Sequence, residues 1–189
     1  MRKATADEKE LVVTILVQSF DDNKSVNYTI KQDTRRRQRI RKLMEYSFEI
    51  CSMFGNVFIS DDNKGCALVV MPDKKRTTFK SIWLDVRLVF GAIGIVSARK
   101  AMSRETAIKK IHPNDALYYL WFIGVQPSEQ GKGIGSRLLT EVIQEGKSKR
   151  RTVCLETSTL KNIRWYEKHG FKTYRELDFG YTLYCMKIS

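Results

Sequence analysis

Apolar residues recur at two different spacings along the chain, and the two spacings together predict a mixed α/β fold. Apolar positions three and four apart predict helices over residues 7–19, 34–52, 136–147 and 162–169. Thr34 is the expected cap of the second helix. Residues 78–91 and 95–110 are predicted to be two further helices, hinged between Gly91 and Gly94. Residues 24–33 are expected to form a loop.

Short apolar runs bounded by turn residues predict strands at 2–5, 57–60, 66–71, 117–125, 152–156, 171–177 and 181–187. Asp61 to Gly65 have the composition of a hairpin turn, and the last two strands are expected to pair antiparallel. Helices that cover a mixed sheet are the architecture that this order of elements predicts.

A glycine-rich turn between the strand over 117–125 and the helix over 136–147 is the strongest functional signal. It contains Gln130, Gly131, Lys132, Gly133, Ile134 and Gly135, followed by Ser136. N–H groups at a helix start point outward, and the helix dipole favours negative charge there. Glycine also allows positive φ and lets a phosphate approach the backbone. The turn therefore predicts a phosphate-bearing ligand.

The positions of the glycines in this turn exclude two common phosphate-binding motifs. A Walker loop and a dinucleotide fingerprint that start at Gly131 both require a glycine where Ser136 stands. A dinucleotide fingerprint that starts at Gly133 requires a glycine at Leu138. The remaining pattern is Gln-x-x-Gly-x-Gly.

A second motif follows at fixed spacing. Asn162, Tyr166 and Gly170-Phe171 are four residues apart, and Gly170 suits the end of a helix. In this order, the two motifs resemble the acetyl-CoA loop and the following helix of the GNAT N-acetyltransferases. The resemblance is specific over residues 118–187, whereas only the order of elements agrees in the N-terminal part. His112-Pro113 is similar to a puromycin-acetyltransferase-like branch, although the second histidine of that branch is absent.

The resemblance implies a twisted, mostly antiparallel sheet of about six or seven strands, flanked by helices. One parallel pair in it would be splayed, between the strand that ends at Val125 and the strand 153–156. Residues 1–189 would form a single domain with a helical insertion at about 76–111.

The implied activity is transfer of an acetyl group from acetyl-CoA to a primary amine, by direct attack in a ternary complex. The acceptor would be a small molecule or a peptide. The implied cofactor-binding residues are Val125, Gln130, Gly131, Lys132, Gly133, Ile134, Gly135, Ser136, Asn162 and Tyr166.

The same resemblance assigns roles in the chemistry. Backbone N–H groups near Val125 would polarise the acetyl carbonyl. Tyr166 would protonate the departing thiolate, or it would only pack against the last strands. Asn162 would hydrogen-bond the cofactor or cap its helix. Glu156 is the first candidate for the base, and its alternative is a structural carboxylate paired with a Lys or Arg. His112 is interpreted as a loop histidine.

The composition adds a basic surplus, because 34 Lys and Arg residues face 21 Asp and Glu residues, for a net charge of +13. Part of it would meet the phosphates of CoA. A cluster on one predicted helix is left over: Arg35, Arg36, Arg37, Arg39, Arg41 and Lys42. It is either a solvated helix face or a contact for nucleic acid or an acidic partner. The alternative function is therefore a basic GNAT-shaped binding module.

The four cysteines, Cys51, Cys66, Cys154 and Cys185, form no C-x-x-C pair and are interpreted as reduced residues of a cytoplasmic protein. His112 and His169 lack ligand spacing, so no metal is expected. The apolar run 88–96 is too short to span a bilayer, and no membrane partner is predicted. The helices over 78–110 are either a lid or core helices, and we favour core helices that partly line the substrate pocket. A monomer or a homodimer is expected.

Overall fold

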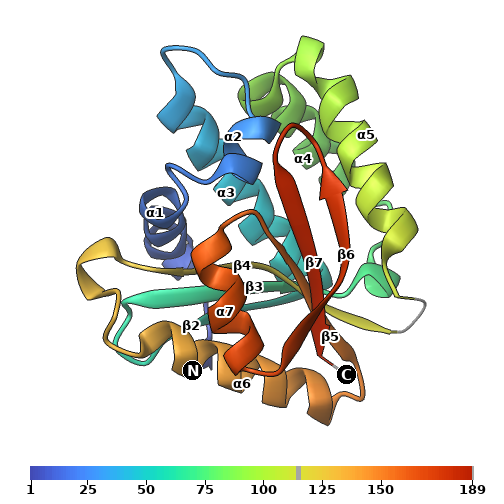
Figure 1. The fold of residues 1–189 in the computed structure, drawn as a ribbon. Coiled ribbons are helices and arrows are strands. Elements are labelled where there is room, and N and C mark those ends of the chain that lie inside the picture. The colour runs from blue at the N-terminus through green and yellow to red at the C-terminus, as the bar shows by residue number, and fades with distance from the viewer. Residues whose placement is uncertain (114–115, 189) are drawn as a thin grey trace.

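The computed structural model describes residues 1–113 and 116–188, with Val96 described by its backbone alone. It contains a seven-stranded sheet in the order β1-β2-β3-β4-β5-β7-β6 (Figure 1). The strands are β1 (Arg2–Lys3), β2 (Gly55–Ile59), β3 (Gly65–Val70), β4 (Leu117–Val125), β5 (Thr152–Thr157), β6 (Phe171–Asp178) and β7 (Thr182–Ile188). Strands β4 and β5 are parallel, and the other neighbouring pairs in this order are antiparallel.

Helices cover both faces of this sheet. They are α1 (Lys9–Ser19), α2 (Lys24–Thr29), α3 (Arg36–Phe54), α4 (Phe79–Leu88), α5 (Ile95–Ile111), α6 (Ile134–Ser148) and α7 (Leu160–Lys168). A π-helical turn, Val89–Ile93, joins α4 to α5. Alternate side chains of β3 enter opposite cores, because successive side chains of a strand point to opposite faces. Leu68 packs with α1 and α3, whereas Val69 packs with α6 and α7.

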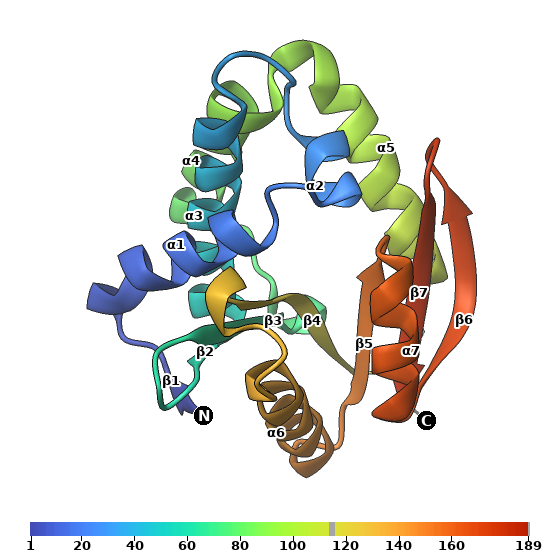
Figure 2. The same cartoon turned by 60° about the vertical axis from the view of Figure 1, so that its left-hand side comes forward.

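The sheet opens between β4 and β5. Pairing is confined to Leu117, Tyr118 and Tyr119, which face Thr152, Val153 and Cys154. Beyond this point β5 pairs only with β7, and the two halves of the sheet diverge (Figure 2). The predicted fold, a mixed and mostly antiparallel sheet with a splayed parallel pair and flanking helices, is confirmed.

Two local predictions near the N-terminus were wrong, and side-chain capping explains both. Residues 24–29 form α2 instead of a loop, because the Asn23 side chain accepts a hydrogen bond from the Val26 N–H at 3.0 Å. Helix α3 begins at Arg36 without a Thr34 cap. The Asp33 carboxylate accepts the Arg35 N–H at 3.0 Å and so opens the turn that leads into α3.

The predicted helices and hinge over residues 78–110 are present, but α4 is not a core helix. Only Ser81 and Leu84 of α4 are buried, and Phe79, Trp83 and the following Phe90 are exposed. The interpretation as a core helix was wrong, because the apolar face of α4 points outward. The helix contacts α3 only through a narrow inward side, where Ser81 and Leu84 are buried. Partial lining of a pocket is confirmed, through Leu88 and the π-helical turn.

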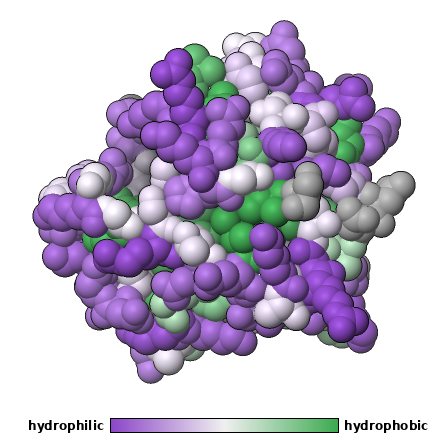
Figure 3. All heavy atoms as spheres, turned by 60° about the horizontal axis from the view of Figure 1, so that its bottom comes forward, coloured by the Kyte–Doolittle hydropathy of each residue, from purple (hydrophilic) through white to green (hydrophobic). Residues whose placement is uncertain are grey.

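The surface is strongly hydrophilic, as Figure 3 shows for one face, where hydrophobic residues are concentrated near the centre. Among the described residues no single helix is long and apolar enough to cross a membrane. The two segments Phe79–Ile93 and Ser97–Ile111 reach that length and composition only together, and they are bent by 118°.

Gly55 joins α3 to β2 at a point where another backbone comes too close for any side chain. A Cβ at Gly55 would lie 1.9 Å from the Val69 carbonyl oxygen. We expect Gly55→Ala to destabilise the protein by about 2–3 kcal/mol, because the sheet backbone must shift. Thermal denaturation should show a Tm lower by roughly 4–12 °C. The control is Gly135→Ala, whose Cβ meets neighbours only at 3.6 Å. Equal Tm values for both variants would contradict the prediction.

Candidate active site

The gap between β4 and β5 exposes backbone donors of β4. The Gln126 N–H donates to the Lys64 carbonyl at 2.9 Å, on the β3 side. Because N–H groups alternate between the two sides of a strand, those of Val125 and Ile123 point toward the side that β5 has left. The Val125 carbonyl accepts from Ser19 at 2.9 Å and from the Gln130 side chain at 3.2 Å. The end of β4 is therefore held in place while its N–H faces the gap.

The glycine turn follows at the exposed start of α6. Gly131 and Gly133 have φ values of 80° and 81°, a left-handed conformation that favours glycine. Gly133 is the N-cap of α6 and supplies no side-chain cap. Within the described part of the chain, no acceptor is found for the N–H groups of Ile134 and Gly135. The turn thus presents free donors at the positive end of a 15-residue helix.

Side chains around the turn position it against α7. The Trp165 indole N–H donates to the Ser136 hydroxyl at 2.9 Å, which ties α7 to the first turn of α6. Glu129 accepts from Lys64 at 3.0 Å and from Lys132 at 3.1 Å, and these ammonium groups lower the pKa of the Glu129 carboxyl. Lys132 is 60% exposed and can still reach a bound anion.

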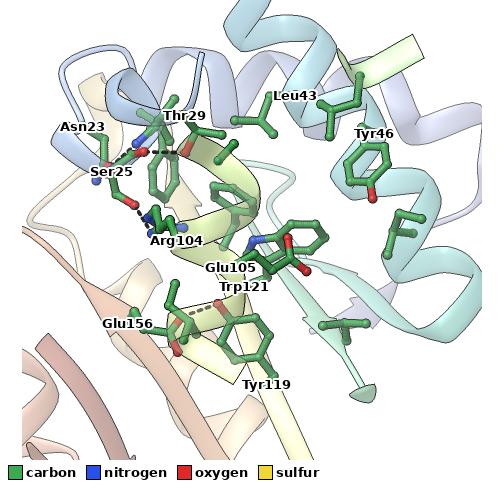
Figure 4. Close-up of a pocket in the computed structure, with 18 of the residues that line it drawn as sticks. Asn23, Ser25, Thr29, Leu43, Tyr46, Arg104, Glu105, Tyr119, Trp121 and Glu156 are labelled. Carbon is green, nitrogen blue, oxygen red and sulfur yellow. Dashed lines mark hydrogen bonds between the residues drawn. The ribbon is translucent and has the colours of Figure 1, made fainter. Parts of the chain in front are cut away.

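A cavity of about 560 Å³ extends from the gap toward α3 and α4. Figure 4 shows Glu156 and Tyr119 near each other in its wall, with Leu43 and Tyr46 from α3 further away. The wall is contributed by α2, α3, the α4–α5 segment, β4, β5 and α7. Much of it is apolar or aromatic, including Trp121 and Phe122.

Glu156 lies in this wall with a side chain that is only 4% exposed. Its Oε2 accepts a hydrogen bond from the Tyr119 hydroxyl, and its Oε1 is 3.4 Å from the His112 Nε2. Burial, and then the Glu156 carboxylate, raise the pKa of the Tyr119 phenol well above its usual value. Among the described residues, no Lys or Arg forms an ion pair with Glu156. The ion pair with Lys or Arg that the alternative interpretation expected is not found in the described part of the chain, and the role of Glu156 as a base stays a prediction.

Tyr119 and His112 were not predicted as site residues, and the parallel pairing explains why they belong here. Tyr119 pairs in register with Cys154, two residues before Glu156. His112 follows the last residue of α5, and its ring lies 5.4 Å from that of Tyr119. The only sequence signal was the position of His112 shortly before the strand that ends at Val125. From the sequence alone, His112 is interpreted as a loop histidine.

Tyr166 and Asn162 both line the cavity from α7. Tyr166 is buried, packs edge-on against Phe171, and burial raises the pKa of its phenol. The described residues contain no hydrogen-bond partner for its hydroxyl, so this hydroxyl is available to a ligand. Asn162 is not a helix cap, because Thr159 is the N-cap of α7. Its side chain is likewise free of any described hydrogen bond.

The structure therefore groups the predicted site residues in two places. Glu156, Asn162 and Tyr166 share the cavity wall. The segment from Gln130 to Ser136 lies outside that wall, at the start of α6, and Val125 connects the two places at the end of β4. No group of three or more potential metal ligands occurs within residues 1–113 and 116–188.

A splayed parallel pair, a glycine turn at a helix start and a cavity beside them together have the arrangement of the GNAT fold. Residues 85–173 match the family model described as an acetyltransferase (GNAT) domain. Residues 85–173 are therefore a GNAT acetyltransferase domain, as the motifs predicted. The similarity to the puromycin-acetyltransferase-like branch stays a prediction, as does the extent of the domain over residues 1–189.

Solved structures agree on the fold. A protein described as histone acetyltransferase HPA2 and related acetyltransferase, from Corynebacterium glutamicum, has a TM-score of 0.74 at 23% identity, covering 98% of this chain and 93% of that one. The C-terminal condensation domain of Ebony, in complex with β-alanyl-dopamine, has a TM-score of 0.73 at 11% identity, covering 98% and 96%. Polyamine N-acetyltransferase from Drosophila melanogaster has a TM-score of 0.60 at 12% identity, covering 99% and 97%.

Proposed function

We propose that this protein transfers an acetyl group from acetyl-CoA to the primary amine of a small molecule, by direct attack in a ternary complex. The proposal rests on one observation: three features that could hold the donor and the acceptor adjoin one another. Free N–H donors at the start of α6, the open gap between β4 and β5, and the cavity that holds Glu156 follow one another.

In this proposal, the donor lies along the gap. The pyrophosphate of CoA binds the free N–H groups of Ile134 and Gly135. The pantetheine arm runs beside β4, and the Val125 N–H stabilises the oxyanion that forms on the acetyl carbonyl. The exposed Lys132 contributes positive charge to the phosphates.

The acceptor enters from the cavity. Glu156 takes a proton from the ammonium group of the acceptor, and His112 offers a route by which that proton reaches solvent. The neutral amine attacks the thioester carbon, a C–N bond forms, and the C–S bond breaks. Tyr166 donates its proton to the departing thiolate and regains one from solvent. The products are an amide and free CoA.

The cavity supports a small amine with an apolar or aromatic portion. A volume of about 560 Å³ is within the usual range for small-molecule sites. Trp121 and Phe122 supply aromatic surface, and Glu156 supplies one buried carboxylate for the amine. Proteins of the same fold, by their descriptions, form N-acetylagmatine or hold β-alanyl-dopamine, and both descriptions agree with an amine acceptor.

The alternative function is a basic module that binds nucleic acid, and it rests on the cluster of cations between residues 35 and 42. The ion pairs of this cluster weaken that alternative. Three of the clustered cations on α3 are engaged within the chain. Arg36 pairs with Asp21 at 2.7 Å, Arg39 pairs with Asp33 at 2.6 Å, and Arg41 pairs with Glu45 at 3.1 Å. Much of this cluster therefore stabilises the packing of α3 and is not free for phosphates.

Acetyl-CoA at a hundredfold excess over its Kd is expected to stabilise the protein by about 2.7 kcal/mol, a rise in Tm of about 5–10 °C. Gly135→Val should abolish most of this rise, because its methyl groups obstruct the approach of a phosphate. Gly135→Ala should retain more of it. Gly135→Ala should keep the Tm of the free protein within a few degrees, because its added Cβ has only ordinary contacts at 3.6 Å, and the Tm of free Gly135→Val shows whether that variant is folded.

Release of free thiol with a panel of small amines then tests the transfer itself. The absence of any rise in Tm at saturating acetyl-CoA would overturn the proposal. A rise in Tm that Gly135→Val leaves unchanged would show that the cofactor binds elsewhere.

A further inference from the structure

The outer face of α4 and the following turn carries most of the exposed large apolar side chains in the described chain. Eight such side chains are exposed, and six of them are Phe79, Ile82, Trp83, Val86, Phe90 and Ile95. The first five stand at positions i, i+3, i+4, i+7 and i+11, so they lie on one face of the helix. Phe79 is 95% exposed and Phe90 is 65% exposed. We call these six residues the α4 apolar face.

This arrangement inverts the usual orientation of an amphipathic helix, whose apolar side faces the core. The inward side of α4 is held by Ser81 and Leu84. The side chains of the α4 apolar face project from the surface, and Trp83 also borders a small pocket between α3 and α4. A rigid protein partner would need matching pockets, whereas the interfacial layer of a bilayer accepts projecting aromatic rings without preformed shape.

Positive charge surrounds the α4 apolar face. Residues 72–110 contain ten Lys and Arg residues and only three acidic residues. All three acids have partners inside the chain. Asp73 pairs with Arg151 at 2.7 Å, Asp85 accepts from Tyr46 at 2.6 Å, and Glu105 pairs with Lys109 at 2.9 Å. Of the ten cations, Lys80 also pairs with Glu49 of α3 at 2.7 Å, so the basic surplus is neutralised only in part.

The unpaired cations lie at both ends of the face. Lys74, Lys75 and Arg76 are exposed directly before Phe79, and among the described residues none has an ion-pair partner. The Arg87 guanidinium lies 4.5 Å from the centre of the Trp83 ring and places a charge on the face itself. Arg99 and Lys100 follow Ile95. Aromatic rings flanked by Lys and Arg suit the boundary between acyl chains and anionic headgroups.

From this combination we infer that the α4 apolar face docks on the surface of an anionic lipid bilayer. The segment is bent by 118° between its two helical parts, a geometry that suits docking in the interface. A second copy of the chain is a poorer occupant, because pairing this face with itself would bring two unneutralised basic clusters together. The prediction of no membrane partner considered only the length of apolar runs, which does not bear on surface docking.

Docking would also place the bilayer against the outer side of the cavity wall. Leu88, Val89 and Ile93, which belong to the same segment, line the cavity from within. The inference does not depend on acetyl transfer, since it rests only on the exposed face and the charges around it.

The test is co-sedimentation of the full chain with vesicles of phosphatidylcholine alone and with phosphatidylserine added. We expect binding to the anionic vesicles that weakens as salt is raised. The variant Phe79→Ser/Trp83→Ser should lower the partition constant at least about tenfold. Leu160→Ser, which removes an exposed apolar side chain on α7, should leave it unchanged. Equal melting temperatures would show that all variants are folded.

A second pair of variants tests the charge. Replacing Lys74, Lys75 and Arg76 by Gln should weaken binding to anionic vesicles, whereas replacing Lys147, Lys149 and Arg150 by Gln should have little effect. Equal effects of the two triple variants, or vesicle binding that Phe79→Ser/Trp83→Ser leaves intact, would overturn the inference. So would binding to polyglutamate without binding to vesicles, which indicates an acidic protein, or a dimer that Phe79→Ser/Trp83→Ser returns to monomer.

Discussion

Replacing Tyr166 by phenylalanine is expected to lower kcat about a hundredfold, while the affinity for acetyl-CoA stays within about a factor of two. In the proposed mechanism the phenol protonates the thiolate only as it leaves, so the interaction belongs to the transition state. Single-turnover thiol release and the shift in Tm with acetyl-CoA measure the two quantities separately.

The surroundings of Tyr166 make this test specific. No described residue hydrogen-bonds its hydroxyl, so its removal should not destabilise the fold. Burial raises the pKa of the phenol above its ordinary value, so the acid form persists through alkaline pH. The wild-type rate should therefore show no fall from ionisation of Tyr166 between about pH 7 and 9.

Tyr174→Phe is the matched control, because it also deletes a hydroxyl without a partner, at a position outside the cavity wall. Its kcat should equal that of the wild type. An unchanged kcat in Tyr166→Phe would mean that the thiolate departs without this acid, and Tyr166 would then be a packing residue beside Trp165 and Phe171.

Replacing Glu156 by glutamine is expected to lower kcat/KM by about 10²–10³-fold at pH 7. Glutamine keeps an oxygen that accepts the Tyr119 hydroxyl, so the wall of the cavity should stay in place. What it loses is the negative charge that attracts an ammonium group and accepts its proton. The loss should shrink as pH rises toward the pKa of the substrate amine, because more acceptor then arrives neutral.

The measurement is the pH profile of kcat/KM for the wild type, Glu156→Gln and the control Glu176→Gln, whose carboxylate is exposed on β6. The control should follow the wild type. A Glu156→Gln profile that runs parallel to the wild type at all pH values would contradict a role as base, because the defect would not depend on the ionisation of the acceptor.

Predictions that depend on residues close in sequence agreed with the structure more often than predictions that depend on tertiary contacts. The glycine turn and the spacing from Asn162 to Gly170 are local, and both were read correctly from the sequence. Short-range capping by Asn23 was missed, because six residues are too few for an apolar period to show. The outward orientation of α4 was missed because a helical period identifies an apolar face but not the direction in which that face points.

By itself the sequence determined the GNAT resemblance, the glycine turn and the order of the strand and helix around it, since these depend on backbone conformations that neighbouring residues impose. Only the tertiary structure decided which groups meet Glu156. Tyr119 and His112 are 37 and 44 residues away along the chain, and the short parallel pairing of β4 with β5 brings them together. It also decided that the α4 apolar face lies outside the core, because burial depends on which surfaces the rest of the fold leaves available.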